Sequence, residues 1–210
     1  MPMPPDPCDS MAEQIPLHFA FNPELSFACF YPGKNLEVVQ HLKDSILGRG
    51  ESPVFLWGEP GTGKTHLLNA CCREASTQGK TISYLPLNLL ESYGPLLLEG
   101  LEQQDLVCLD DLNAIAGQPV WEEALFILFN ELRTLGHTLI VAASRPPGQL
   151  AIALPDLATR LGWGLTLKLH PIGDAECLTL LRLYAQSLGL ELSPRVGQFL
   201  LSHYRRDVPA

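Results

Sequence analysis

The chain has 210 residues, a formal net charge of −9 at pH 7 and a hydrophobic fraction of 46%. This length suits one α/β core with a small second part. The negative charge argues against a protein whose main task is to bind the phosphate backbone of DNA, and it still permits a local basic patch. No run approaches the ~18 consecutive apolar residues of a membrane span, so we expect no membrane partner. The six cysteines show neither C-x-x-C pairing nor metal-ligand spacing, which favours the reducing cytoplasm.

The N-terminal stretch, residues 1–19, has neither the basic region nor the apolar core of a signal peptide. Its composition is typical of a flexible tail. We therefore expect the folded part of the chain to begin near residue 20, with a first helix over residues 36–47.

The most informative segment follows a short apolar run, Val54–Trp57, that predicts a buried strand, and it precedes a helix predicted over residues 64–77. It fits the pattern G-x-x-x-x-G-K-[ST], whose glycines let successive backbone N–H groups point at phosphate oxygens. The lysine supplies a charge for the β- and γ-phosphates, and the threonine supplies a hydroxyl for Mg²⁺. A chance glycine-rich loop is the alternative, and the flanking strand and helix argue against it. The residues expected to bind a nucleotide are Gly58, Glu59, Pro60, Gly61, Thr62, Gly63, Lys64, Thr65 and His66.

Strand and helix signals alternate downstream, which is the pattern of a parallel sheet with helices on both faces. We expect an α/β fold of the P-loop NTPase type, with a parallel five-stranded sheet flanked by helices. Four glycines, Gly48, Gly79, Gly136 and Gly189, stand where helices should end. The predicted strands are 53–57, 81–86, 106–110, 138–143 and 165–169, and the predicted helices are 36–47, 64–77, 88–103, 121–135, 155–161, 174–188 and 194–203.

Two carboxylates, Asp110 and Asp111, stand at the end of the predicted strand 106–110. A P-loop core needs an acid at the end of a neighbouring strand to hold Mg²⁺ and orient water. We assign Asp110 to the metal and Asp111 to the polarisation of water. A solvated Asp-Asp turn is the alternative, and the upstream P-loop favours the catalytic interpretation. Ser144 follows the next strand and could sense the γ-phosphate, although a serine at a strand end is usually a turn former.

A break near Pro171 divides the predicted nucleotide-binding core, residues 20–170, from a helical part over residues 171–210. Two helices are predicted in this second part. The sequence reaches Ala210 just where another helix would begin, so we expect an incomplete helical lid.

Several of these segments together resemble the AAA+ domain of the bacterial replication initiator DnaA and its relatives. Upstream, residues 27–35 resemble the segment that lines the adenine pocket in those proteins. The resemblance covers residues 20–207 and implies an AAA+ fold that binds ADP or ATP with Mg²⁺. The matching segments are Gly63-Lys64-Thr65-His66-Leu67-Leu68, Leu109-Asp110-Asp111 and Leu154-Pro155-Asp156-Leu157-Ala158-Thr159-Arg160-Leu161-Gly162-Trp163-Gly164.

Within this family the chain resembles the Hda type, the DnaA-homologous regulatory inactivators. We expect no C-terminal helix-turn-helix domain and no room, between strand 81–86 and Asp110, for the helical insertion with which initiators open origin DNA. Residues 14–19 resemble the Q-L-x-L-x-F peptide that docks on the bacterial sliding clamp. In such a peptide Leu17 and Phe19 fill an apolar pocket while Gln14 bonds at its edge. Packing of Leu17 and Phe19 on the ATPase core is the alternative.

By the same resemblance, Arg160 occupies the position of an arginine finger, which reaches the γ-phosphate held by a neighbouring subunit. The alternative is an i,i+4 surface salt bridge to Asp156, worth only a few tenths of a kcal/mol. Three departures from the family pattern lower the expected intrinsic hydrolysis. Ser144 stands where the family usually has Asp or Asn, the second sensor arginine falls near Pro209, and the chain stops before the last lid helices.

The resemblance therefore implies a cytoplasmic regulator of replication initiation that reaches DNA indirectly, through the DNA polymerase III beta sliding clamp. Holding a nucleotide, expected to be ADP, it would present Arg160 to ATP-bound DnaA, stimulate hydrolysis in trans and prevent re-initiation. Its own ATPase would be weak or absent. Two alternatives stay open: an autonomous AAA+ ATPase or helicase loader, and a DnaA-like DNA-binding initiator paralogue. AAA+ geometry would also permit a head-to-tail homo-oligomer.

Overall fold

A computed structural model of the chain describes residues 25–187 and 189–203. Five strands form one parallel sheet in the order β2-β3-β4-β1-β5, which confirms the predicted architecture. Because parallel strands place all their carboxyl ends at one edge, the loops that follow the strands gather along that edge. The strands are β1 (Val54–Trp57), β2 (Ile82–Pro86), β3 (Leu106–Asp110), β4 (Thr138–Ala143) and β5 (Leu165–Lys168).

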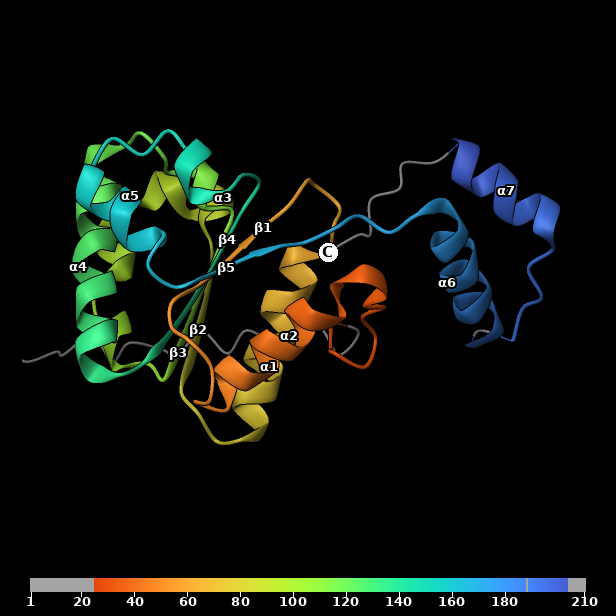
Figure 1. Ribbon diagram of the computed structural model, residues 1–210, viewed down its shortest axis with the longest axis horizontal. Coiled ribbons are helices and arrows are strands. Elements are labelled where there is room, and N and C mark those ends of the chain that lie inside the picture. Colours follow the sequence, from red (N-terminus) through yellow and green to blue (C-terminus); the bar gives the residue numbers. More distant parts are fainter. Residues whose placement is uncertain (1–24, 188, 204–210) are drawn as a thin grey trace, which may run out of the picture.

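Helices cover both faces of the sheet (Figure 1). One hydrophobic cluster joins a sheet face to α4 and α5, and a second joins the opposite face to α1 and α2. Since alternate residues of a strand point to opposite faces, β1 sends Phe55 into the first cluster and Leu56 into the second. The helices of this core are α1 (Leu36–Ile46), α2 (Lys64–Thr77), α3 (Leu87–Leu90), α4 (Pro119–Leu135) and α5 (Pro155–Leu161).

The limits of α4 follow from its local sequence. The helix begins at Pro119, earlier than the predicted residue 121, because the fixed φ of proline suits the first helical turn. It ends before Gly136, which has φ +75°. The N–H groups of Gly136 and His137 donate to carbonyl groups in the last helical turn. The other glycines predicted to end helices also have positive φ: Gly48, Gly79 and Gly189.

The prediction of a single helix over residues 88–103 is wrong. Gly94 has φ +87° and Gly100 has φ +81°, and a right-handed helix cannot continue through that conformation. Pro95 in addition lacks the N–H that an α-helix would need. The apolar residues that suggested a helix instead pack against α4 from short turns. Beside α3, the segment forms the 3₁₀ turns η2 (Glu91–Tyr93), η3 (Pro95–Leu98) and η4 (Leu101–Gln103).

Beyond β5, the chain forms α6 (Asp174–Ser187) and α7 (Pro194–His203), which pack against each other. The pair lies at the right-hand end of Figure 1, beside the layers around the sheet. The predicted boundary near Pro171 falls in the connection between β5 and α6. The division into a core over residues 20–170 and a lid over residues 171–210 stays a prediction. The predicted tail, residues 1–19, and the predicted sensor position near Pro209 lie outside the described residues. Among the described helices, none has both the length and the apolar character that crossing a membrane requires.

Candidate nucleotide-binding site

The loop between β1 and α2 lies at the carboxyl edge of the sheet, and its shape requires glycine at two places. At Gly63, φ is +93° and an added Cβ would lie 2.8 Å from the Phe30 ring. At Gly58, an added Cβ would lie 2.7 Å from the carbonyl oxygen of Leu169. The N–H of Gly58 also donates to the carbonyl of Ala143, at the end of β4 (3.3 Å). The loop therefore keeps the narrow, side-chain-free path that close approach to phosphate groups requires.

Lys64 is the buried cation of this loop, with 8% of its surface exposed. Its ammonium group donates to the carbonyl oxygens of Gly58 (2.8 Å) and Glu59 (3.0 Å). Burial lowers the pKa of Lys64, whereas the nearby charges of Asp110 and Asp111 raise it. The ammonium group thus lies within the loop, and its contact with the β- and γ-phosphates of a nucleotide stays a prediction.

Thr65 and Asp110, the residues expected to hold Mg²⁺, are in direct contact. Thr65 Oγ1 donates to Asp110 Oδ2 at 2.6 Å, and the Tyr84 hydroxyl donates to the same oxygen at 3.0 Å. Burial, followed by the charge of Asp110, raises the pKa of Tyr84, so the hydroxyl remains a donor at neutral pH. A buried carboxylate beside a hydroxyl offers the oxygen ligands that Mg²⁺ prefers. These residues therefore fit the ion, which would take its further ligands from water and phosphate.

Asp111 follows Asp110 in a strained backbone conformation, with φ +54°. Its N–H donates to Asp110 Oδ1 at 3.0 Å. Burial and the charge of Asp110 raise the pKa of Asp111, while Lys64 lowers it. A carboxylate with a raised pKa is better suited to accept a proton from water, as the predicted role requires.

Ser144 lies directly after β4, beside the turn that follows Asp111. Its backbone N–H donates to Asn113 Oδ1 at 3.1 Å. Asn113 belongs to η5 (Leu112–Ala114) and was not expected at the site from the sequence. The structure therefore brings Ser144 close to the acidic turn, and its part as a γ-phosphate sensor stays a prediction.

The segment expected to line the adenine pocket lies against the start of α2. His66 Nε2 lies 2.8 Å from the carbonyl oxygen of Ser26, just before this segment, and the His66 ring contacts the Phe30 ring with centroids 5.3 Å apart. Asn35, which is 2% exposed, exchanges two hydrogen bonds with the backbone of His170 (2.7 and 2.9 Å). These contacts hold the His66 side chain against this part of the chain, and its contact with a nucleotide stays a prediction.

Arg160 lies on α5 and stacks on aromatic rings. Its Cζ atom is 4.1 Å from the ring centroid of Trp163 and 5.5 Å from that of Phe126. The Cζ atom of Arg133 lies 4.6 Å from the same Trp163 ring. In the described part of the chain, no ion pair joins Arg160 to Asp156 and no hydrogen bond joins it to the P-loop. The salt-bridge alternative is therefore not what the structure forms.

A buried carboxylate fixes the chain just before α5. Glu122 is 1% exposed and accepts N–H bonds from Gly117 (2.6 Å), Ala153 (3.1 Å) and Leu154 (2.7 Å). Because Leu154 immediately precedes α5, these bonds hold the start of the helix that carries Arg160. The sequence analysis missed Glu122. Its spacing of three residues from the apolar Leu125 is the signal that could have placed it on the buried face of α4.

A model of the bacterial DnaA ATPase domain matches residues 21–92 and 95–168, more than half of the chain. The chain belongs to this family. The structure of AMPPCP-bound DnaA from Aquifex aeolicus is similar at 25% identity with a TM-score of 0.77, over 90% of this chain and 62% of that one. Domain III of DnaA from Thermotoga maritima has 25% identity and a TM-score of 0.73, over 86% of this chain and 81% of that one. A DnaA bound to AMPPCP and single-stranded DNA has 25% identity and a TM-score of 0.76, over 88% and 61%.

The chain is therefore a DnaA-like AAA+ domain with the P-loop NTPase fold that the sequence predicted, and it is related to replication proteins. It spans 61 and 62% of the length of two of these DnaA structures. The roles of the individual site residues stay predictions.

Proposed function

We propose that this DnaA-family domain regulates replication initiation in the manner of the Hda type, by stimulating hydrolysis of the ATP that DnaA holds. The observation that carries the proposal is the set of contacts that the Arg160 guanidinium group makes. Its guanidinium group is supported by two rings, is free of an ion pair with Asp156, and is not bonded to its own P-loop. A guanidinium group that is bonded neither to Asp156 nor to its own P-loop is available to a phosphate held by a neighbouring subunit, where it would stabilise the charge that develops.

The nucleotide site of the chain itself would hold ADP or ATP. Lys64 would bind the β- and γ-phosphates, and Thr65 and Asp110 would hold Mg²⁺. DnaA structures have been solved with AMPPCP, an ATP analogue, which supports an adenine nucleotide here. We propose that the chain hydrolyses ATP only weakly, because Ser144 provides a short hydroxyl where the family usually has Asp or Asn as the sensor. The bound nucleotide would then have a structural role.

The proposal includes a tether to the beta sliding clamp through Gln14, Leu17 and Phe19. These residues lie outside the described part of the chain, so the tether rests on the sequence motif. It would hold this cytoplasmic protein on the nucleoid, bound to DNA only through the clamp.

The decisive experiment measures single-turnover hydrolysis of ATP pre-bound to DnaA, with the clamp loaded on DNA. An arginine finger is worth ~10³–10⁵ in rate, so Arg160→Ala is expected to remove nearly all the stimulation. Arg133→Ala is the matched control, because it removes an arginine from the same Trp163 ring and should retain most of the stimulation. If Arg160→Ala stimulates hydrolysis as well as the wild type, the mechanism is wrong.

The tether is tested separately by co-precipitation with the clamp. The double variant Leu17→Ala/Phe19→Ala should lose binding, since both side chains would fill the apolar pocket of the clamp. His18→Ala, at a variable position of the motif, should bind like the wild type. Binding that persists in the double variant would remove the tether from the proposal.

An autonomous ATPase is the second candidate, because the structure brings Lys64, Thr65, Asp110 and Asp111 together at one edge of the sheet. It predicts substantial turnover by the isolated chain that Asp111→Asn abolishes and that does not depend on Gln14. A DNA-binding initiator paralogue would instead show an affinity for duplex DNA that falls steeply with salt.

A further inference from the structure

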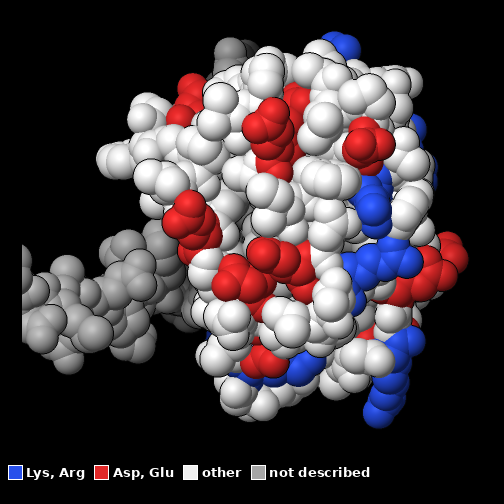
Figure 2. Space-filling model, turned by 90° about the vertical axis from the view of Figure 1, so that its left-hand side faces the viewer, with Lys and Arg blue, Asp and Glu red and all other residues white. Residues whose placement is uncertain are grey.

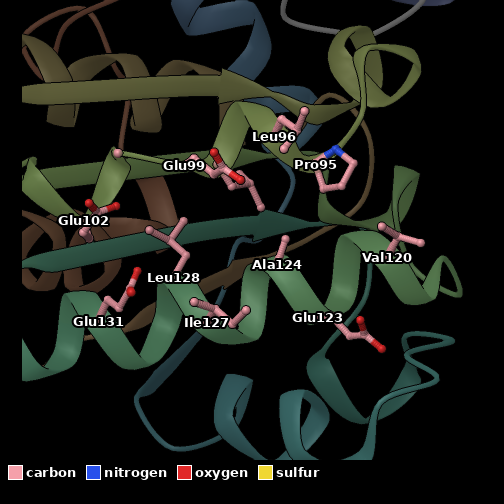
Figure 3. A pocket seen from close by; sticks show the side chains of 12 residues that line it. Pro95, Leu96, Glu99, Glu102, Val120, Glu123, Ala124, Ile127, Leu128 and Glu131 are labelled. Atoms are coloured by element: carbon pink, nitrogen blue, oxygen red, sulfur yellow. The ribbon is translucent and has the colours of Figure 1, made fainter.

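A groove runs along one side of α4, and η3 and η4 form its other wall (Figure 3). The groove has a volume of about 450 Å³. The α4 residues that line it recur every three or four positions, so they form one continuous face of the helix. They are Val120, Glu123, Ala124, Ile127, Leu128 and Glu131.

The floor of the groove is apolar and open to solvent. Leu96 on η3 is 72% exposed, and Val120 and Ile127 on α4 are 65% and 56% exposed. Adjacent large apolar side chains exposed in this way are typical of an interaction site. Covering them would be favourable by roughly 25 cal/mol for each Å² of apolar surface removed from water.

Carboxylates stand on both sides of this floor. Glu123 and Glu131 project from α4, and Glu99 and Glu102 come from the opposite wall (Figure 3). No lysine or arginine lines the groove, and in the described part of the chain none of these four carboxylates forms an ion pair. Figure 2 views the side of the molecule on which α4 lies, and red acidic groups are spread there among residues that carry no charge. The groove therefore combines an apolar floor with a negative potential on both rims.

We propose that this groove docks a basic amphipathic helix of a partner protein. Apolar side chains at i, i+3, i+4 and i+7 of the partner would cover the floor, while flanking lysines or arginines would meet the four carboxylates. The stretch of α4 from Val120 to Glu131 rises roughly 16 Å, which is enough for about three turns of such a helix. The inference goes beyond the proposed function, because the groove includes neither the P-loop nor Arg160.

Charge argues against two other occupants. A nucleic acid would bring its phosphates against the four carboxylates, which repel them. The N-terminal segment of the chain, residues 1–24, contains four acidic residues and no lysine or arginine, so it does not complement the groove.

The test uses a fluorescent Leu/Lys peptide that is amphipathic when helical, titrated with the full chain near physiological salt. The wild type should bind it, and Ile127→Asp should weaken binding about tenfold or more, since a charge would stand on the apolar floor. Glu123→Gln/Glu131→Gln should weaken binding and reduce its dependence on salt. All these side chains are at the surface, and unchanged thermal unfolding of the variants checks that the fold is kept.

Matched controls separate the groove from the overall negative charge. Leu47→Asp changes an apolar residue that is 46% exposed outside the groove, and Glu51→Gln/Glu74→Gln removes two exposed carboxylates elsewhere. Both controls should keep the wild-type affinity.

Equal affinity of the groove variants and the wild type would overturn the proposal, as would an equal loss in the controls. Binding of a Leu/Glu peptide, or Ile127-dependent binding of single-stranded DNA, would also contradict it. If the peptide does not bind while sedimentation shows self-association that Ile127→Asp abolishes, the groove is an interface between copies and the proposal is wrong.

Discussion

At the scale of single residues, the predicted nucleotide site brings opposite charges close together at the carboxyl edge of the sheet. Burial lowers the pKa of Lys64 and raises that of Asp111, and each charge moderates the shift of the other. Thr65, bonded to Asp110 at 2.6 Å, completes the cluster. This arrangement is the one that the predicted nucleotide and Mg²⁺ would need.

Lys64→Ala should weaken binding of ADP and ATP by roughly 10- to 100-fold, because a hydrogen bond to a charged group contributes about 1.5–3 kcal/mol. Titration calorimetry measures this affinity. Lys80→Ala is the control, since Lys80 precedes β2 and lies at the opposite edge of the sheet. An affinity of Lys64→Ala equal to that of the wild type would remove the P-loop lysine from the site.

Asp111→Asn should stabilise the nucleotide-free chain at neutral pH. The pKa of Asp111 is raised on folding, so the folded state binds more protons than the unfolded state between the two pKa values. The free energy of unfolding contributed by this group thus falls as pH rises through that range. The advantage of the asparagine should shrink as pH decreases toward the ordinary carboxylate pKa of ~3.9, and thermal unfolding at several pH values measures it.

Asp105→Asn provides a control of opposite sign. The N–H and hydroxyl of Thr81 donate to Asp105 Oδ2 (2.8 and 2.9 Å) and lower the pKa of Asp105. The stabilisation from this carboxylate is present above its ordinary pKa and is lost as pH falls through its lowered pKa in the folded state. Asp105→Asn should therefore be less stable than the wild type at neutral pH. If the two variants respond to pH in the same direction, these assignments are wrong.

At the scale of elements, α4 supports the surroundings of Arg160 and lines the groove. Its inward face packs on the sheet, and its buried Glu122 holds the chain before α5. Its Phe126 and Arg133 contact the cluster of Arg160 and Trp163. The position of Arg160 therefore depends on a helix distant from it in sequence.

Glu122→Gln should lower the free energy of unfolding by about 2–4 kcal/mol, because one carboxylate oxygen becomes an amide that faces buried N–H donors. Urea unfolding measures the loss. Glu123→Gln is the control, and a surface change of this kind should stay within about 0.5 kcal/mol. Equal stability of the two variants would show that the bonds to Ala153 and Leu154 contribute little.

Trp163→Ala should reduce the stimulation of DnaA-bound ATP hydrolysis by roughly 2- to 5-fold, since an exposed cation–π contact is worth about 0.5–1 kcal/mol. Trp163→Phe keeps an aromatic ring under Arg160 and should retain more of the activity. The measurement is the single-turnover assay described above. Unchanged stimulation by Trp163→Ala would show that the ring does not position Arg160.

At the scale of the whole molecule, the strand order places β1 between β4 and β5. This brings the P-loop, the acidic turn and Ser144 to one edge, and the same sheet supports α4 and α5 on one face. A ligand at that edge therefore contacts loops from several strands at once.

Binding of ADP with Mg²⁺ should therefore stabilise the whole domain. At 100 times the dissociation constant, a ligand adds about 2.7 kcal/mol, which corresponds to a rise in Tm of roughly 5–10 °C for a domain of this size. Differential scanning fluorimetry measures the shift, and Lys64→Ala should show much less at the same ADP concentration. An equal shift in that variant would indicate binding elsewhere.

Local patterns predicted most of the fold because hydrophobic periodicity and turn residues act over short distances. The apolar run before Gly58 and the two acids at the end of β3 were sufficient to predict the loop and the acidic turn that the structure brings to one edge of the sheet. The prediction failed over residues 88–103, where the apolar spacing resembled a helix but Gly94 and Pro95 interrupt it. Asn113 and Tyr84 were missed because their partners are distant in sequence.

The sequence by itself determined the P-loop, the strands around it and the membership of the DnaA family, since these depend on consecutive residues and their spacing. Only the tertiary structure decided that Arg160 stacks on Trp163 instead of pairing with Asp156, and that Glu122 is buried. Only packing of η3 and η4 on α4 produced the acidic groove. These features depend on which side chains meet across the fold, and a burial pattern on one helix does not specify its neighbours.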